Sequence, residues 1–149
     1  MNRRQFLKNS ILTTASLSLA PTLARAQSVP AHAQVIGAND DIRVAVVGLN
    51  GRGKNHLDNL SNLKGVRVVA VCDVDRAVLD KIGAYTKEKY NFTPQVYQDY
   101  RKLLENKDID AVTLATPNHW HSLGGIWAAQ AGNDVYVEKP ISHNLWEGR

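Results

Sequence analysis

The 149-residue sequence is poor in cysteine and has no long apolar run. Its single cysteine, Cys72, cannot form an internal disulfide, which excludes a small disulfide-stapled domain. No stretch approaches the roughly 18 consecutive apolar residues that cross a bilayer, so we expect no stable membrane anchor. With 44% hydrophobic and 21% charged residues, the composition is typical of an ordinary globular domain rather than of a disordered or fibrous chain.

Acidic residues are absent from the first 26 positions. The whole chain has 18 Lys and Arg against 14 Asp and Glu, a surplus that by itself suggests a nucleic-acid or anionic-membrane partner. Arg3, Arg4, Lys8 and Arg25 account for all of this surplus. Without these four residues the Lys and Arg equal the 14 Asp and Glu, so we expect no nucleic-acid partner.

The same basic residues belong to a pattern that is typical of an export signal. They surround a mildly apolar stretch over residues 11–23, and an A-x-A cleavage site follows at residues 24–26. The R-R-x-F-L-K run resembles the twin-arginine signal, with Asn2 where Ser or Thr is usual. We therefore predict a signal peptide over residues 1–26 and a linker over residues 27–41. The alternatives are an amphipathic first helix and a membrane anchor interrupted by polar residues.

The twin-arginine resemblance implies export of an already folded protein that loads its cofactor in the cytoplasm. The expected partner is the twin-arginine export machinery, and the expected location is periplasmic or secreted. The lack of paired cysteines is compatible with folding in a reducing compartment.

From Ile42 onward, β-branched runs alternate with helical periodicity. The expected strands are Ile42–Gly48, Val66–Asp73, Gln95–Tyr97, Asp110–Pro117 and Asp134–Pro140. One helix is expected through Leu57, one beginning at Asp75 and one beginning at Asp99. A further helix is expected to run through Ala131, and another to begin near Ser142. Several strands are apolar almost throughout, which is typical of a parallel sheet covered on both faces. The sequence predicts an α/β fold with a doubly wound, Rossmann-like parallel sheet over residues 42–149, truncated at its end.

A glycine-rich turn follows the first strand, with the sequence Gly48-Leu49-Asn50-Gly51-Arg52-Gly53. The dinucleotide fingerprint G-x-G-x-x-G needs glycines for a tight turn, for the approach of backbone to pyrophosphate, and for close helix packing. Here Asn50 takes the place of the second glycine, and Asn tolerates a left-handed backbone. The helix that follows would direct its free N–H groups at a phosphate. A plain loop is the alternative.

Asp73 ends the second strand, at the spacing from Gly48 that is expected of a carboxylate binding the adenosine ribose hydroxyls. A carboxylate there repels a 2′-phosphate, so NAD is favoured over NADP, although Arg76 nearby could accept that phosphate. The alternative for Asp73 is a solvated strand end or a helix cap.

Two polar segments follow the fourth and fifth strands, Asn118-His119-Trp120-His121 and Glu138-Lys139-Pro140. Because the carboxyl ends of parallel strands line the ligand crevice, both segments are expected at the cofactor site. We expect no metal site, because H-x-H lacks a third ligand. Lys139 could donate to a carbonyl or alkoxide, whereas the alternative for Glu138-Lys139-Pro140 is a surface ion pair followed by a turn. The alternative for Trp120 is simple packing.

Together the glycine-rich turn, Asp73, T-P-N-H-W-H and E-K-P-I-S-H-N resemble the N-terminal domain of the Gfo/Idh/MocA family of nicotinamide-dependent sugar oxidoreductases. The resemblance covers about residues 42–149. The leader and N-H-W-H also resemble a secreted branch that includes NAD-dependent α-N-acetylgalactosaminidases. The family pattern implies a C-terminal α/β substrate domain, missing here, that supplies the other acid/base residues and could support a homo-oligomer.

The resemblance also implies a role for each site residue. The pyrophosphate would lie against Gly48, Asn50, Gly51, Arg52 and Gly53. The adenosine ribose would be held by Asp73, and the nicotinamide side would be lined by Asn118, His119, Trp120 and His121. Glu138 would lie beside the nicotinamide ribose, and Lys139 would contact the cofactor and act as the catalytic group that polarises the substrate hydroxyl.

We therefore expect the cofactor domain of an NAD-dependent oxidoreductase that transfers a hydride to or from a sugar or polyol. One alternative is an NAD-dependent glycosidase, which cleaves its substrate by transient oxidation and elimination. Another is a dinucleotide-binding module that no longer catalyses a reaction.

Overall fold

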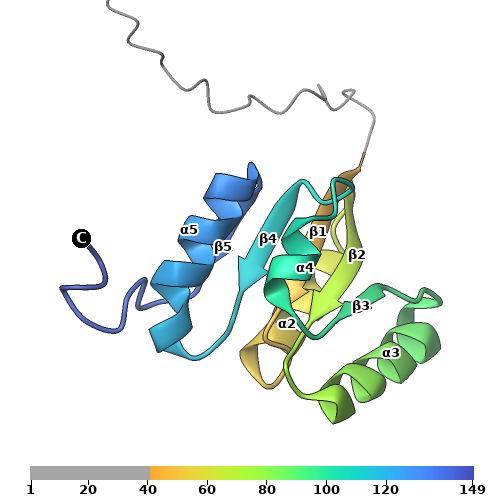
Figure 1. Cartoon of the computed structure of the whole chain (residues 1–149). Helices are drawn as coiled ribbons and strands as arrows, with labels where there is room; N and C mark the ends of the chain where they lie inside the picture. Colours follow the sequence, from red (N-terminus) through yellow and green to blue (C-terminus); the bar gives the residue numbers. More distant parts are fainter. Residues whose placement is uncertain (1–40) are drawn as a thin grey trace, which may run out of the picture. The chain divides into compact units, whose positions relative to one another are not determined.

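A five-stranded parallel sheet forms the centre of the fold in the computed structural model, which describes residues 41–149 (Figure 1). Its strands are β1 (Ile42–Val47), β2 (Val66–Cys72), β3 (Gln95–Tyr97), β4 (Ala111–Leu114) and β5 (Asp134–Val137). The order across the sheet is β3-β2-β1-β4-β5, and every neighbouring pair is parallel. The predicted doubly wound, Rossmann-like sheet is confirmed.

Helices connect the strands. They are α2 (Arg52–Ser61), α3 (Arg76–Tyr90), α4 (Tyr100–Leu104) and α5 (His121–Ala131), and a short 3-10 turn, η1 (Asn118–Trp120), precedes α5. The aspartates expected at two helix starts are N-caps, because Asp75 accepts from the Ala77 amide at 2.8 Å and Asp99 from the Arg101 amide at 2.9 Å. No helix within residues 41–149 is long and apolar enough to span a membrane.

The core has two layers because successive strand residues point to opposite faces of the sheet. In β1, Ala45 and Val47 belong to the cluster that includes Leu103 of α4 and Ala128 of α5. Val46, between them, belongs to the cluster formed with α2 and α3. Burial on both faces explains why these strands read as continuous apolar runs.

The helix expected near Ser142 is not formed, and that prediction is wrong. Residues 138–149 make bends and turns, with a single helix-like hydrogen bond from the Gly148 amide to the Asn144 carbonyl at 3.3 Å. Starting a helix is costly and needs packing to offset it. Here the apolar side chains of Leu145 and Trp146 are 87% and 85% exposed, so they contribute little burial. The predicted signal peptide and residues 27–40 of the predicted linker lie outside the described residues.

A cluster of hydrogen-bonded side chains, centred on Asp58 of α2, joins α2 to α3. One carboxylate oxygen of Asp58 accepts from the hydroxyls of Tyr85 and Tyr90, at 2.6 and 2.8 Å. Lys54 lies over the Tyr85 ring, 3.8 Å from its centroid, and Lys89 approaches the same carboxylate at 3.4 Å. Burial alone would raise the pKa of Asp58, but these hydrogen bonds outweigh it and lower the pKa to about 2.

We expect Asp58→Asn to lower the free energy of unfolding by about 1–2 kcal/mol at pH 7. The folded pKa of about 2 lies below the ordinary value of 3.8, so the contribution is complete above the ordinary value and disappears as the pH falls through 2. Denaturant unfolding at several pH values measures this, with Asp80→Asn, in an exposed pair with Arg76, as the near-neutral control. An equal loss at pH 2 and pH 7 would contradict the assignment.

Candidate functional site

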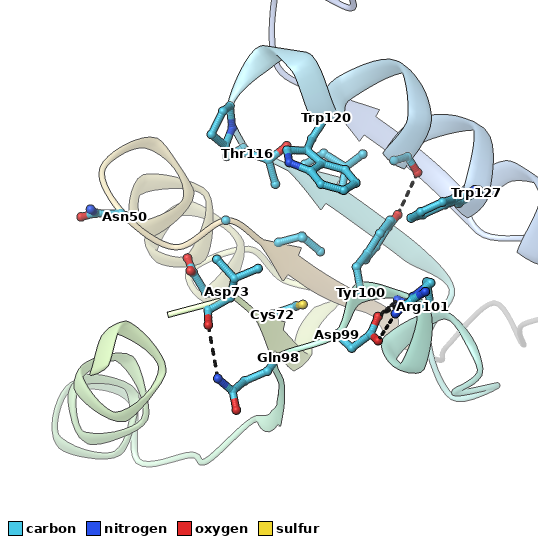
Figure 2. A pocket seen from close by; sticks show the side chains of 17 residues that line it. Asn50, Cys72, Asp73, Gln98, Asp99, Tyr100, Arg101, Thr116, Trp120 and Trp127 are labelled. Carbon is cyan, nitrogen blue, oxygen red and sulfur yellow. Dashed lines mark hydrogen bonds and ion pairs between the residues drawn. The ribbon is translucent and has the colours of Figure 1, made fainter. Parts of the chain in front are cut away.

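A cleft of about 830 Å³ lies at the carboxyl ends of the central strands (Figure 2). The chain places β2 and β3 on one side of β1 and then crosses to place β4 and β5 on the other. In open parallel sheets, ligands bind outside the strand ends at such a switch point. The cleft is lined after β1 by Gly48 and Asn50, after β2 by Asp73, and after β4 by Thr116 and Trp120.

The glycine-rich turn has two positions at which no side chain fits. A Cβ on Gly53 would lie 1.6 Å from the Gly48 carbonyl oxygen, so the first turn of α2 packs directly against the end of β1. A Cβ on Gly48 would lie 2.8 Å from the backbone of Ala115 and Thr116. The left-handed residues of the turn are Gly48 and Gly51, with φ of 79° and 66°. Asn50 therefore does not need the left-handed tolerance for which it was considered, since Asn91 is the one non-glycine residue with positive φ in residues 41–149.

Asp73 holds the turn in place. Its carboxylate accepts from the Leu49 amide at 2.8 Å and from the Asp75 amide at 3.0 Å. One side chain thus fixes both the turn after β1 and the segment that leads into α3. Each carboxylate oxygen has a further lone pair, so the group can still accept from hydroxyl donors in the cleft.

Aromatic side chains form one wall of the cleft. Trp120 and Trp127 lie with ring centroids 6.4 Å apart, and Tyr100 lies 6.5 Å from Trp127 (Figure 2). Tyr100 donates to the Gly124 carbonyl at 3.0 Å, which fixes its ring. Cys72 lies at the floor, where burial raises the pKa of its thiol to about 12. This combination of apolar wall and polar turn suits a ligand with a flat ring and charged groups.

Trp120 lines the same cleft as Asp73, whereas the other residues of its predicted segment are placed differently. His121 is buried, and its ring nitrogens lie 2.7 Å from the Pro140 carbonyl and 2.8 Å from the Thr116 carbonyl. It therefore joins the loops that follow β5 and β4. Asn118 links the same two loops, because its side-chain oxygen lies 3.1 Å from Nδ1 of His143. His119 is exposed.

A second polar group lies where α2 begins. Glu138, directly after β5, accepts from Nε of Arg52 and from Nε2 of His56, both at 2.7 Å. The hydrogen bond from Arg52, followed by that from His56, lowers the pKa of Glu138 to about 2. Sequence reasoning missed His56, although it lies four residues after Arg52 and thus on the same helix face.

Lys139, next in the chain, is exposed and precedes a cis peptide bond to Pro140. Neither Lys139 nor Glu138 lines the cleft. Across the described part of the chain, no group of three or more His, Cys, Asp or Glu side chains is arranged to hold a metal ion.

Comparison with known proteins agrees with this geometry. Residues 42–149 match the family model described as "Oxidoreductase family, NAD-binding Rossmann fold", that of the Gfo/Idh/MocA proteins. A glycosyl hydrolase family 109 protein of Shewanella sp. (strain W3-18-1) is 35% identical, over 99% of this chain and 35% of the relative. A second such protein, from Shewanella sp. (strain ANA-3), is 32% identical over 98% of this chain and 36% of its own length. The chain thus spans about a third of these relatives.

Solved structures of dehydrogenases are also similar in fold to this chain. Scyllo-inositol dehydrogenase from Lactobacillus casei, with NAD(H) and scyllo-inositol, has a TM-score of 0.64 and 28% identity over 72% of this chain and 31% of that one. The WlbA dehydrogenase from Bordetella pertussis, with NADH and UDP-GlcNAcA, has a TM-score of 0.65 and 28% identity over the same shares.

We expect Gly53→Ala to weaken NAD binding tenfold or more and to cost about 1–3 kcal/mol of stability, since its methyl group must displace the Gly48 carbonyl. Titration calorimetry and thermal unfolding measure the two effects. Gly83→Ala in α3 is the matched control, because a Cβ there meets no atom within 4 Å. That variant should bind NAD normally and be slightly stabilised. Normal NAD binding by the Gly53 variant would show that the tight turn is not the binding element.

Proposed function

Since the chain belongs to the Gfo/Idh/MocA family of NAD-binding oxidoreductases, we propose that the whole protein transfers a hydride between a sugar or polyol and NAD. The observation that carries this proposal is the cleft at the switch point, where the glycine-rich turn and Asp73 meet. Dehydrogenases of inositols and of a UDP-sugar acid are among the structural neighbours, which supports a polyhydroxylated substrate. The described residues form the cofactor domain of such an enzyme.

The turn fits a dinucleotide because the missing side chains of Gly48 and Gly53 leave backbone as its inner surface. Gly48, Asn50, Gly51 and Gly53 would hold the pyrophosphate at the start of α2, with Arg52 as its positive charge. Asp73, fixed by two backbone amides, would accept from the adenosine ribose hydroxyls. When bound, NAD supplies the hydride acceptor for oxidation of the substrate carbinol.

The charges near Asp73 favour NAD over NADP. The Arg76 guanidinium, which could receive a 2′-phosphate, is paired with Asp80 at 3.0 Å. Arg101, which lines the cleft, is paired with Asp99 at 2.7 Å. A 2′-phosphate would therefore meet the Asp73 carboxylate while both nearby guanidinium groups are already engaged.

Lys139 is the group in this domain best suited to the substrate. Its ammonium is exposed beside the loop that His121 fixes, so it can reach a ligand without breaking a buried contact. A lysine there can donate to the substrate oxygen and stabilise negative charge as a proton leaves. We assign the other acid/base groups to the part of the protein beyond this domain.

A second candidate function is an NAD-dependent glycosidase. It is favoured by the relatives named glycosyl hydrolase family 109 proteins, which match almost the whole of this chain. The same cofactor cleft serves both reactions, and the difference lies in whether oxidation of the substrate persists or is reversed.

One assay on the full-length protein separates these functions. With NAD and a panel of sugars and polyols, accumulation of NADH, followed by its absorbance, identifies a dehydrogenase. Release of aglycone from chromogenic glycosides without NADH identifies the glycosidase. NAD binding with neither product would leave a binding module and overturn the enzymatic proposal.

In the active assay, Lys139→Ala should reduce kcat by about 100-fold or more while NAD affinity changes little. Lys102→Ala, at an exposed pair with Glu105, is the control and should match the wild type. Unchanged turnover in the Lys139 variant would remove this lysine from the mechanism.

We also propose that residues 1–26 direct export through the twin-arginine pathway. Support comes from the relatives, which match 98–99% of this chain and so align beyond its cofactor domain. Replacing Arg3 and Arg4 together by Lys keeps the charge and should stop export, as measured by cell fractionation. Lys8→Arg is the control, and continued export of the double variant would contradict the proposal.

A further inference from the structure

Glu138 lies between the start of α2 and the end of β5, and its two donors come from one face of the helix. Arg52 is the first residue of α2 and is 58% exposed at its side chain, whereas the side chains of Glu138 and His56 are 14% and 8% exposed. The carboxylate is thus buried on the His56 side and reaches Arg52 on the open side.

The contact with Arg52 leaves much of its guanidinium available. Arg52 donates to Glu138 through Nε, and the Tyr136 hydroxyl also interacts with this group. The terminal nitrogens carry most of the N–H donors and are the part of a guanidinium that binds phosphate oxygens. A carboxylate on Nε therefore fixes the direction of the guanidinium without occupying the whole fork.

His56 in turn fixes Glu138. Its Nε2 donates to the carboxylate at 2.7 Å, and its ring packs edge-on against Tyr136 with centroids 5.5 Å apart. Its other nitrogen, Nδ1, is buried with no hydrogen-bond partner among the described residues. A ring with its hydrogen on Nε2 satisfies the contact and leaves only an acceptor unpaired.

We propose that Glu138 is a positioning residue for Arg52, held by His56, and that it acts on the pyrophosphate of the cofactor rather than on the nicotinamide ribose. This inference rests on the proposed binding of NAD in the cleft. Arg52 lies between Gly51 and Gly53, at the helix start where phosphate groups bind. Glu138 prevents this flexible side chain from sampling other orientations, so less entropy is lost when phosphate binds.

The test compares ligands that differ in the groups Glu138 could affect. Titration calorimetry on the full-length protein measures the affinity for NAD, for ADP and for adenosine. ADP lacks the second ribose and the nicotinamide, and adenosine also lacks the phosphates. We expect Glu138→Gln to weaken NAD and ADP alike, by about tenfold, and to leave adenosine unchanged. The control Glu105→Gln makes the same charge change in an exposed pair at the end of α4 and should bind all three ligands normally.

Two further variants test the chain of contacts. Arg52→Ala alone should weaken ADP binding as much as Arg52→Ala combined with Glu138→Gln, because the glutamate acts only through the arginine. His56→Leu should weaken ADP, and His56→Gln should restore binding, because its amide nitrogen can replace Nε2 as a donor. The His56 pair does not contain Glu138→Gln, so it keeps the test decisive if that variant does not fold.

The opposing outcomes are distinct. Weaker NAD binding with unchanged ADP binding would place Glu138 at the nicotinamide ribose and overturn the inference. Equal loss of adenosine binding would show general disruption of the domain and overturn it too. Wild-type protein that binds neither NAD nor ADP would instead contradict the proposed function.

Discussion

The close approach of α2 to the end of β1 is the constraint on which the site depends. With no side chain on Gly53, the first turn of the helix rests on the Gly48 carbonyl, and Gly48 itself rests on the backbone after β4. These two contacts set the direction of α2 relative to β1 and β4. The free N–H groups of the helix start, the Asp73 carboxylate and the Arg52 side chain are all placed as a result.

Charges around the cleft are paired before any ligand arrives. Asp73 accepts from two backbone amides, Glu138 from Arg52 and His56, and Asp99 from Arg101, whose hydrogen bond lowers the pKa of that aspartate to about 2. Paired groups need little rearrangement to receive a dinucleotide. On the proposed function, a dinucleotide would bind through preorganised dipoles and ion pairs rather than through net charge, in keeping with a chain whose Lys and Arg equal its Asp and Glu once residues 1–26 are left out.

The sequence predicted the fold well because its signals are local. Apolar runs located the strands, Asp75 and Asp99 marked helix starts, and the glycine spacing located the turn. The prediction near Ser142 was wrong because a local helical pattern says nothing of whether its apolar face is buried. The contacts of Glu138 with Arg52 and His56, and of His121 with Pro140, could not be predicted. They join residues 19 to 86 positions apart, whose side-chain directions depend on the folded sheet.

The parallel sheet has a thermodynamic consequence for any ligand of its cleft. The lining residues follow β1, β2, β3 and β4, which are neighbours only when the whole sheet has formed. A partly unfolded chain therefore presents no weaker version of the site, and binding free energy adds in full to the stability of the native state. At a ligand concentration of about 100 times Kd, this linkage amounts to roughly 2.7 kcal/mol. Against the roughly 5–15 kcal/mol by which native domains are stable, that is a substantial contribution.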